Sequence, residues 1–135
     1  MVELKILQQK LIDEFGNRGI DATPIPSIIT NNLNPRFPLR PYQRRAFQYF
    51  CNYWNESFDG KPEKHQLLFH MATGSGKTLI MAGLILYLYE KGYRNFLFFV
   101  NSSNIINKTK DNFLNDSSIK FLFNQSLKIG DKKIN

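Results

Sequence analysis

Polar and apolar residues follow two patterns along this chain, one typical of helices and one typical of buried strands. From Val2 to Phe15, apolar side chains recur at helical spacing, and Gly16 and Gly19 follow as residues that end the helix. The segment Ala22 to Pro38 is rich in Pro, Asn and Ser, which predicts an irregular connector. These first 38 residues are therefore interpreted as an N-terminal extension laid against a main domain of residues 39–135.

Helical and strand-like segments alternate through the main domain. The expected helices are residues 41–54, 76–91 and 104–114. The expected strands are residues 65–70, 94–100 and 120–123. Pro41 suits a first helical turn, Gly92 is placed as a left-handed helix cap, and Gly130-Asp131 is placed as a turn. The order strand, helix, strand, helix predicts a βαβ unit with a right-handed crossover.

An eight-residue segment, Met71-Ala72-Thr73-Gly74-Ser75-Gly76-Lys77-Thr78, joins the first expected strand to the next helix. A strand, a Gly-rich turn and a helix start form the context in which backbone amides bind phosphate. The two glycines permit backbone angles closed to other residues, Lys77 would supply a charge to the phosphates, and the Thr78 hydroxyl would hold Mg²⁺. Met71 stands where the usual pattern begins with Gly. The segment predicts nucleotide binding; the alternative is a Gly-rich turn that happens to precede a Lys-Thr pair.

Composition and charge agree with a globular protein that has a basic surface. The chain has 135 residues, 42% hydrophobic and 14% aromatic, with a formal net charge of +7. Basic residues gather at Arg36, Arg40, Arg44 and Arg45 and again through the C-terminal third. Such a surface suits a polyanion, because each phosphate contact releases counterions. A solvated basic surface without a partner explains the charge equally well.

The cysteine, the histidines and the lengths of the apolar runs exclude some classes of protein. The single Cys51 excludes an internal disulfide and is expected to be a small buried hydrophobe. His65 and His70 lack ligand-spaced partners, so a metal site built from protein side chains is not expected. No apolar run is long enough to span a bilayer, and the first residues lack a secretory pattern, so a cytoplasmic location is expected.

Three segments, taken in order, resemble the first motor lobe of superfamily-two DEAD/DEAH-box helicases and translocases. They are Leu39-Arg40-Pro41-Tyr42-Gln43, Ala72 to Thr78, and Phe98-Phe99-Val100-Asn101-Ser102-Ser103. Within that superfamily the chain looks most like the motor (Res) subunit of type III restriction enzymes, over about residues 39–115. The resemblance implies an α/β, RecA-like P-loop NTPase fold with three layers and a parallel sheet, present here as an incomplete first lobe.

The resemblance also implies roles for particular residues. Gln43 resembles the family's adenine-reading glutamine, since a carboxamide both donates and accepts hydrogen bonds; Arg40 and Tyr42 would flank the base or brace Gln43. The ordinary alternative for Gln43 is a surface amide on a helix. The implied ATP and Mg²⁺ contacts in the loop are Thr73, Gly74, Ser75, Gly76, Lys77, Thr78 and Leu79, with Lys77 and Thr78 also placed in catalysis.

A second group matches the family segment that contacts one strand of DNA. It consists of Asn101, Ser102 and Ser103, whose short polar side chains and helix-start amides suit phosphate oxygens. The family often has Pro at the position of Asn101. The alternative for these residues is simple capping of the following helix.

The catalytic parts of such a motor are expected to be missing from this sequence. No apolar strand is followed by the Asp-Glu pair that holds Mg²⁺ and orients water, and Asp13-Glu14 lies in the N-terminal helical segment. The resemblance implies a second motor lobe, DNA and a modification (methyltransferase) subunit as partners in a longer protein. The chain alone is therefore expected to bind ATP with little hydrolysis. A stand-alone nucleotide-binding module acting with a partner chain, and a small-molecule P-loop kinase, are the other readings considered.

Overall fold

The computed structural model describes residues 6–130 and 132–134. The chain forms two compact units, each built from two stretches of sequence. Unit 1 contains residues 1–25 and 40–72, and unit 2 contains residues 26–39 and 73–135. The N-terminal extension inferred from the sequence thus contributes its helical part to unit 1 and its connector to unit 2.

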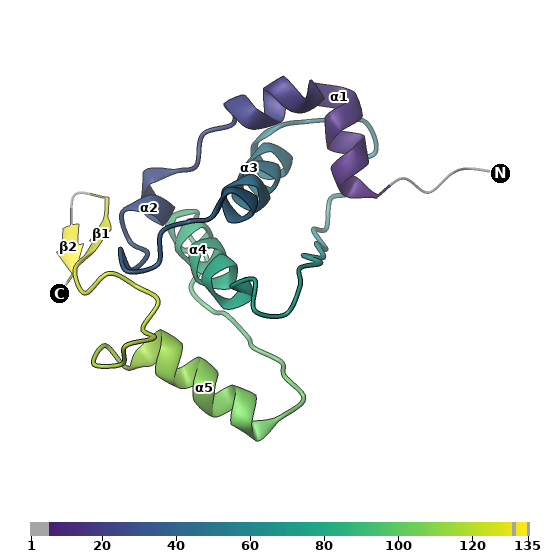
Figure 1. Cartoon of the computed structure of the whole chain (residues 1–135). Coiled ribbons are helices and arrows are strands. Elements are labelled where there is room, and N and C mark those ends of the chain that lie inside the picture. Colours follow the sequence, from purple (N-terminus) through teal and green to yellow (C-terminus); the bar gives the residue numbers. More distant parts are fainter. Residues whose placement is uncertain (1–5, 131, 135) are drawn as a thin grey trace. The chain divides into compact units, whose positions relative to one another are not determined.

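Unit 1 is organised around two helices, α1 (Leu7–Ala22) and α3 (Pro41–Asn55), which pack against each other (Figure 1). Its buried centre joins Leu11 and Ile20 of α1 to Tyr53 of α3. α1 bends at Gly16, whose φ of 69° and ψ of 163° are not helical. The predicted end of the helix at Gly16 is therefore only partly right, because the chain resumes a helical path to Ala22. Tertiary packing explains the continuation, since Ile20 is fully buried.

The α3 helix confirms the prediction of a helix from Pro41, which occupies its first turn. The sequence pattern predicts an apolar face made of Tyr42, Ala46, Tyr49, Phe50 and Tyr53. This prediction is partly wrong, because Tyr42 is 44% exposed, whereas Phe47, outside that face, is fully buried. Cys51 is buried, as predicted. Because α3 carries polar residues on a face that contacts α1, helical spacing of apolar residues alone misassigns its orientation.

Unit 2 contains α2 (Ser27–Thr30), α4 (Lys77–Glu90), α5 (Ser103–Leu114) and a hairpin of β1 (Leu127–Ile129) and β2 (Lys132–Ile134). The short α2 lies in the predicted connector and packs on α4, with Ile28 and Ile29 buried (Figure 1). The predicted turn is present at Gly130, where φ is 60°; Asp131 lies outside the described residues, as do Val2 to Lys5 of the first predicted helix.

The end of α4 confirms the predicted left-handed cap at Gly92. Its φ is 103°, a region that favours glycine. The Gly92 N–H donates to the Tyr89 carbonyl and the Tyr93 N–H donates to the Leu88 carbonyl, both at 3.1 Å. This pair of bonds is a Schellman motif, which provides N–H donors for carbonyls that the helix end would otherwise leave without hydrogen bonds.

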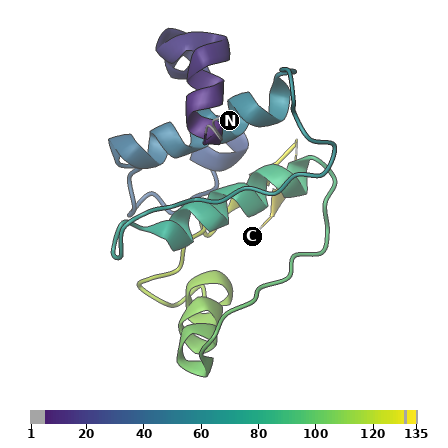
Figure 2. The same ribbon diagram turned by 90° about the vertical axis from the view of Figure 1, so that its right-hand side faces the viewer.

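The predicted parallel strands are not formed. Among residues 6–130 and 132–134, the strands are β1 and β2, which pair antiparallel with Leu127 opposite Ile134. Segments 65–70 and 94–100 run without strand pairing, and the second forms a long link between α4 and α5 (Figure 2). Residues 120–123 contribute a single antiparallel bridge, between Phe123 and Leu33.

The physical reason is the absence of ladder partners and of cover within the described residues. A parallel strand needs a neighbour for its backbone groups and apolar layers on both faces. Instead, Leu68, Leu97 and Phe99 are 92%, 82% and 88% exposed. Side chains hold these segments in place: the ring centroids of Phe50 and Phe69 lie 6.5 Å apart, and those of Phe98 and Phe113 lie 5.5 Å apart.

Asn32 joins the connector to the end of the chain within unit 2. Its side chain is fully buried, and Nδ2 donates to the carbonyls of Ile28 and Lys128, each at 2.8 Å. Its Oδ1 accepts the Lys128 N–H, and its own carbonyl accepts the Asn124 N–H at 2.7 Å. A buried amide with all its hydrogen bonds made costs little, whereas an unmade one costs about 1–3 kcal/mol. Sequence reasoning missed this residue because Lys128 lies 96 positions away.

Candidate nucleotide-binding site

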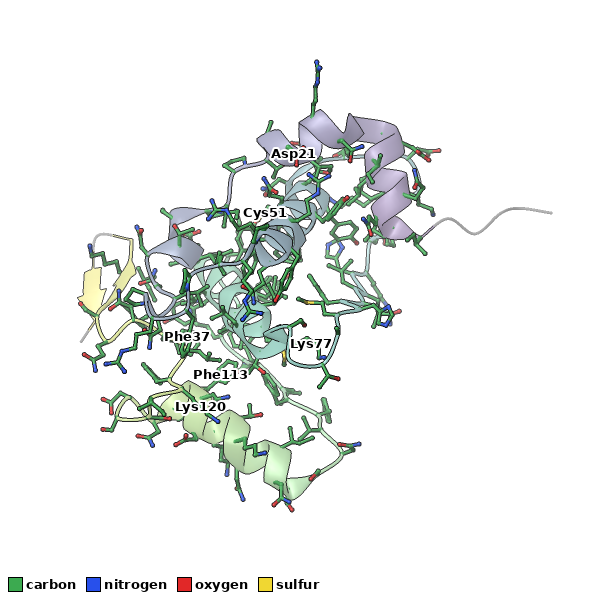
Figure 3. The ribbon with its side chains drawn as sticks, viewed as in Figure 1. Asp21, Phe37, Cys51, Lys77, Phe113 and Lys120 are labelled. Carbon is green, nitrogen blue, oxygen red and sulfur yellow. The ribbon has the colours of Figure 1, made fainter. Side chains whose placement is uncertain are left out.

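The Gly-rich loop has the backbone conformation that its sequence requires. Gly74 and Gly76 have φ values of 76° and 82°, in the left-handed region that side chains disfavour. Gly76 is the N-cap of α4, which begins at Lys77, where Figure 3 places the lysine at the junction of loop and helix. The helical ladder starts with the N–H groups of Leu79 and Ile80, which both donate to the Gly76 carbonyl, at 3.0 and 3.3 Å.

This geometry creates a place for an anion at the start of α4. The first amides of any helix precede its hydrogen-bonded ladder, and the helix dipole adds partial positive charge there. Lys77 is exposed and Thr78 is half-buried. The chemistry available at this point is therefore amide donors, one ammonium group and one hydroxyl oxygen, which together suit a phosphate chain.

The rest of α4 anchors the loop in unit 2. Leu79, Ile80, Ala82 and Leu86 are buried, and the helix packs against α2. Burying such side chains contributes about 1.5–3 kcal/mol each for the larger ones. Leu79 thus has a packing role at the end of the loop, while its backbone N–H is already bonded to Gly76.

The predicted adenine-reading residues gather on the first turn of α3, in unit 1. Gln43 is 3% exposed, so the alternative of a surface amide does not describe it. Its Oε1 accepts the Arg40 N–H at 2.9 Å, forming half of a capping box. Arg40 Nη1 donates to the Tyr42 hydroxyl at 2.9 Å. A carboxamide held in this way has a fixed orientation, because rotating it would break the bond to the Arg40 backbone.

The predicted DNA-contacting residues lie at the start of α5, in unit 2. Ser102 is the N-cap of that helix and makes no side-chain capping hydrogen bond. Asn101 and Ser103 are exposed, as are Lys108 and Lys110 further along the same helix. The capping alternative therefore does not account for the Ser102 hydroxyl.

Positive charge is distributed unequally between the units. Unit 2 carries ten Lys and Arg residues against four Asp and Glu, whereas unit 1 carries eight against seven. The arginine cluster noted in the sequence is also partly neutralised, since Arg45 forms an ion pair with Asp21. The excess charge available to a polyanion therefore belongs to unit 2.

In the part of the chain that the structure describes, no group of three or more His, Cys, Asp or Glu side chains could hold a metal ion. The Thr78 hydroxyl alone offers Mg²⁺ the oxygen ligand it prefers, and phosphate oxygens and waters would have to supply the others. No helix among these residues is long and apolar enough to cross a membrane.

The Gly-rich loop and the helix that follows it have the sequence pattern of P-loop proteins. The sequence model of the family described as "Type III restriction enzyme, res subunit" matches residues 36–135, and the chain belongs to this family.

A curated relative gives the same family. The chain is 43% identical over 119 residues to the "Probable type III restriction-modification enzyme HindVIP Res subunit" of Haemophilus influenzae. The match covers 84% of this chain and 23% of the relative, so the chain spans less than a quarter of that protein's length. No solved structure matches the chain.

Proposed function

We propose that this chain carries the ATP-binding part of a DNA-translocating, helicase-like ATPase of a type III restriction system. The carrying observation is the loop in which Gly74 and Gly76 adopt left-handed angles directly before α4. Family membership supports the motor assignment. In the longer protein, the proposed partners are a second motor lobe, DNA and a modification subunit.

Each proposed contact has a physical reason. The amides at the start of α4 would bind β- and γ-phosphate oxygens, and Lys77 would place its ammonium group against them. Thr78 would contribute its hydroxyl to Mg²⁺, which neutralises phosphate charge when bound. Gln43 would accept a hydrogen bond from the adenine amino group and donate one to the ring nitrogen beside it.

Equilibrium titration with a fluorescent ATP analogue tests the core of the proposal. Saturable binding is expected in the presence of Mg²⁺ and weaker binding after EDTA is added, because the phosphates then lose a counter-charge. Inorganic triphosphate should compete with the analogue, since the loop contacts phosphates alone. Absence of saturable binding at any Mg²⁺ concentration would contradict an ATP-binding function.

Replacing Gln43 by alanine is expected to reduce the preference for ATP over GTP more than it reduces affinity for triphosphate. A desolvated hydrogen-bond pair is worth roughly 1–3 kcal/mol, so the ATP/GTP preference should fall by about 5- to 150-fold. Arg44→Ala, an exposed residue on the same helix, is the control for changes in α3. Equal losses for the two nucleotides would assign Gln43 to helix capping alone.

We further propose that segments 65–70 and 94–100 are strands of a parallel sheet in a longer Res chain. The support is their apolar sequence together with the exposure of Leu68, Leu97 and Phe99, which a sheet between helix layers would cover. Hydrogen exchange provides a test. Amides 95–100 should exchange rapidly in the 135-residue chain and on the order of 100-fold or more slowly in a full-length subunit. Equally fast exchange in both would contradict the sheet.

DNA binding is proposed to be weak, independent of sequence and located on unit 2. The support is the excess of basic residues in that unit and the exposure of Lys108 and Lys110 on α5. Affinity should fall steeply as salt rises, because each phosphate contact contributes about 0.9 to the slope of log affinity against log salt.

A pair of double variants tests this location. Lys108→Ala with Lys110→Ala should lower the salt slope by up to about 2, measured by fluorescence anisotropy of a labelled duplex between low and moderate salt. Lys10→Ala with Lys64→Ala, which removes two exposed lysines of unit 1, should leave the slope unchanged. A flat salt response of the parent chain would instead leave the basic surface without a nucleic-acid role.

A further inference from the structure

One face of α3 is polar and contacts mainly the second half of α1. The residues on this face are spaced by three, four and seven positions, as on one side of a helix: Arg45, Gln48, Tyr49 and Asn52. The side chains of Arg45, Gln48 and Asn52 donate hydrogen bonds to residues between Asn17 and Thr23. The Tyr49 hydroxyl accepts one from Gln8 at 3.2 Å and one from Arg45 at 3.4 Å. All of these contacts lie within unit 1.

Arg45 is the centre of this contact. Its guanidinium pairs with the Asp21 carboxylate, donates through Nη2 to Asn17 Oδ1 at 3.0 Å, and lies 4.9 Å from the centre of the Tyr49 ring. Figure 3 places Asp21 in the second half of α1. Beside it, Gln48 Nε2 donates to the Asp21 carbonyl at 2.8 Å. A planar guanidinium with several fixed partners sets an orientation that a flexible ammonium group cannot.

Solvent exposure indicates that this contact orients the helix more than it stabilises the fold. The side chain of Arg45 is 27% exposed and that of Asp21 is 65% exposed. Ion pairs this open to water contribute little to stability. The contacts nevertheless restrain the rotation of α3 about its axis, because Asp21 and Asn17 are attached to the end of α1. The bend at Gly16, with φ of 69°, separates this end of α1 from its first half.

The same rotation sets the position of Gln43. Arg45 lies two residues after Gln43 on a continuous helix, so the two side chains turn together. The Gln43 carboxamide is in turn held by the Arg40 N–H. The residues matched by the family model begin at residue 36, so α1 lies outside them. The contact that holds the first turn of α3, which carries Gln43, therefore comes from a part of the chain outside the residues that the family model matches.

We propose that Arg45 is a positioning residue which, through Asp21 and Asn17, orients Gln43 and so determines the preference for adenine nucleotides. This proposal rests on the adenine-reading role proposed for Gln43. It predicts that a contact remote from the phosphates alters base selection while leaving triphosphate affinity unchanged.

The test compares ATP, GTP and inorganic triphosphate as competitors of a fluorescent ATP analogue. Arg45→Ala should lower the ATP/GTP preference roughly 2- to 30-fold with triphosphate affinity unchanged, the range found for residues that couple to a site without touching the ligand. A double variant on α1, Asn17→Ala with Asp21→Ala, should do the same without altering α3. Arg44→Ala, the exposed neighbour of Arg45, is the matched control and should leave the preference as in the parent chain.

The outcomes separate this proposal from the function on which it rests. Circular dichroism at the assay temperature establishes whether each variant is folded. If Arg45→Ala is unfolded, the double variant Asn17→Ala with Asp21→Ala provides the test of the positioning role. An unchanged ATP/GTP ratio in the folded variants, with a parent that prefers ATP, would overturn the positioning role and leave the proposed function standing. If the parent chain bound ATP and GTP equally well, the adenine-reading role of Gln43 would be overturned, and the positioning role of Arg45 with it.

Discussion

Replacing Lys77 by alanine is expected to lower the affinity for Mg²⁺·ATP by about 10- to 100-fold, because hydrogen bonds to charged groups are worth about 1.5–3 kcal/mol. Lys77 is the first residue of α4 and is exposed, so its side chain contributes little to packing. The variant should keep the helical circular dichroism signal and the unfolding midpoint of the parent chain. Titration with a fluorescent ATP analogue measures the change in affinity.

Lys91 supplies the matched control for this prediction. It is the C-cap of the same helix, at the end opposite the loop, and its Nζ lies 5.2 Å from the centre of the Tyr87 ring. Lys91→Ala should therefore bind the analogue as the parent chain does. Equal affinities of Lys77→Ala and the parent would show that the Gly-rich loop does not hold the phosphates.

The 135-residue chain is expected to hydrolyse ATP very slowly or not at all, even with DNA present. A loop that binds ATP and its transition state equally well raises affinity without raising turnover. Acceleration requires a carboxylate that orients water and an arginine finger, the latter worth about 10³–10⁵ in rate in P-loop enzymes. In the sequence, the adjacent acidic pair Asp13-Glu14 belongs to α1 of unit 1, where Asp13 accepts a hydrogen bond from Gln9.

Phosphate release by the purified chain, with and without duplex DNA, measures this turnover. Lys77→Ala serves as the control for contaminating ATPases, since it removes the proposed phosphate contact. DNA-stimulated turnover well above that control would mean that a carboxylate within these residues is catalytic. A chain that binds ATP without hydrolysing it would agree with the proposal that these residues bind the nucleotide but lack the groups that catalyse hydrolysis.

Residues whose role depends on their own backbone angles were predictable from the sequence. The loop of Gly74 and Gly76 was predictable because left-handed backbone angles select glycine whatever surrounds them. Gly92 was predictable for the same reason, and Pro41 because its ring suits a first helical turn. Each of these positions depends on its own backbone geometry and not on a distant partner.

Partners far along the chain account for what the sequence did not reveal. Arg45 belongs to a basic cluster in the sequence, yet the structure pairs it with Asp21, 24 residues earlier. Asn32 stands in a polar connector, yet it is buried and bonds the backbone of Lys128. Helix α1 passes its predicted end because Ile20 is buried in unit 1.

The predicted sheet depends both on local sequence and on distant partners. The apolar run from Phe96 to Val100 predicts a buried strand from composition alone. A strand nevertheless requires neighbours for its N–H and C=O groups, and residues 6–130 and 132–134 provide this segment with none. The sequence by itself therefore determined the conformation of the Gly-rich loop, the approximate bounds of α3 and α4 and the family. Only tertiary structure decided which side chains are buried, which charges are paired and which apolar segments are left uncovered, because each of these depends on atoms that are distant in the chain.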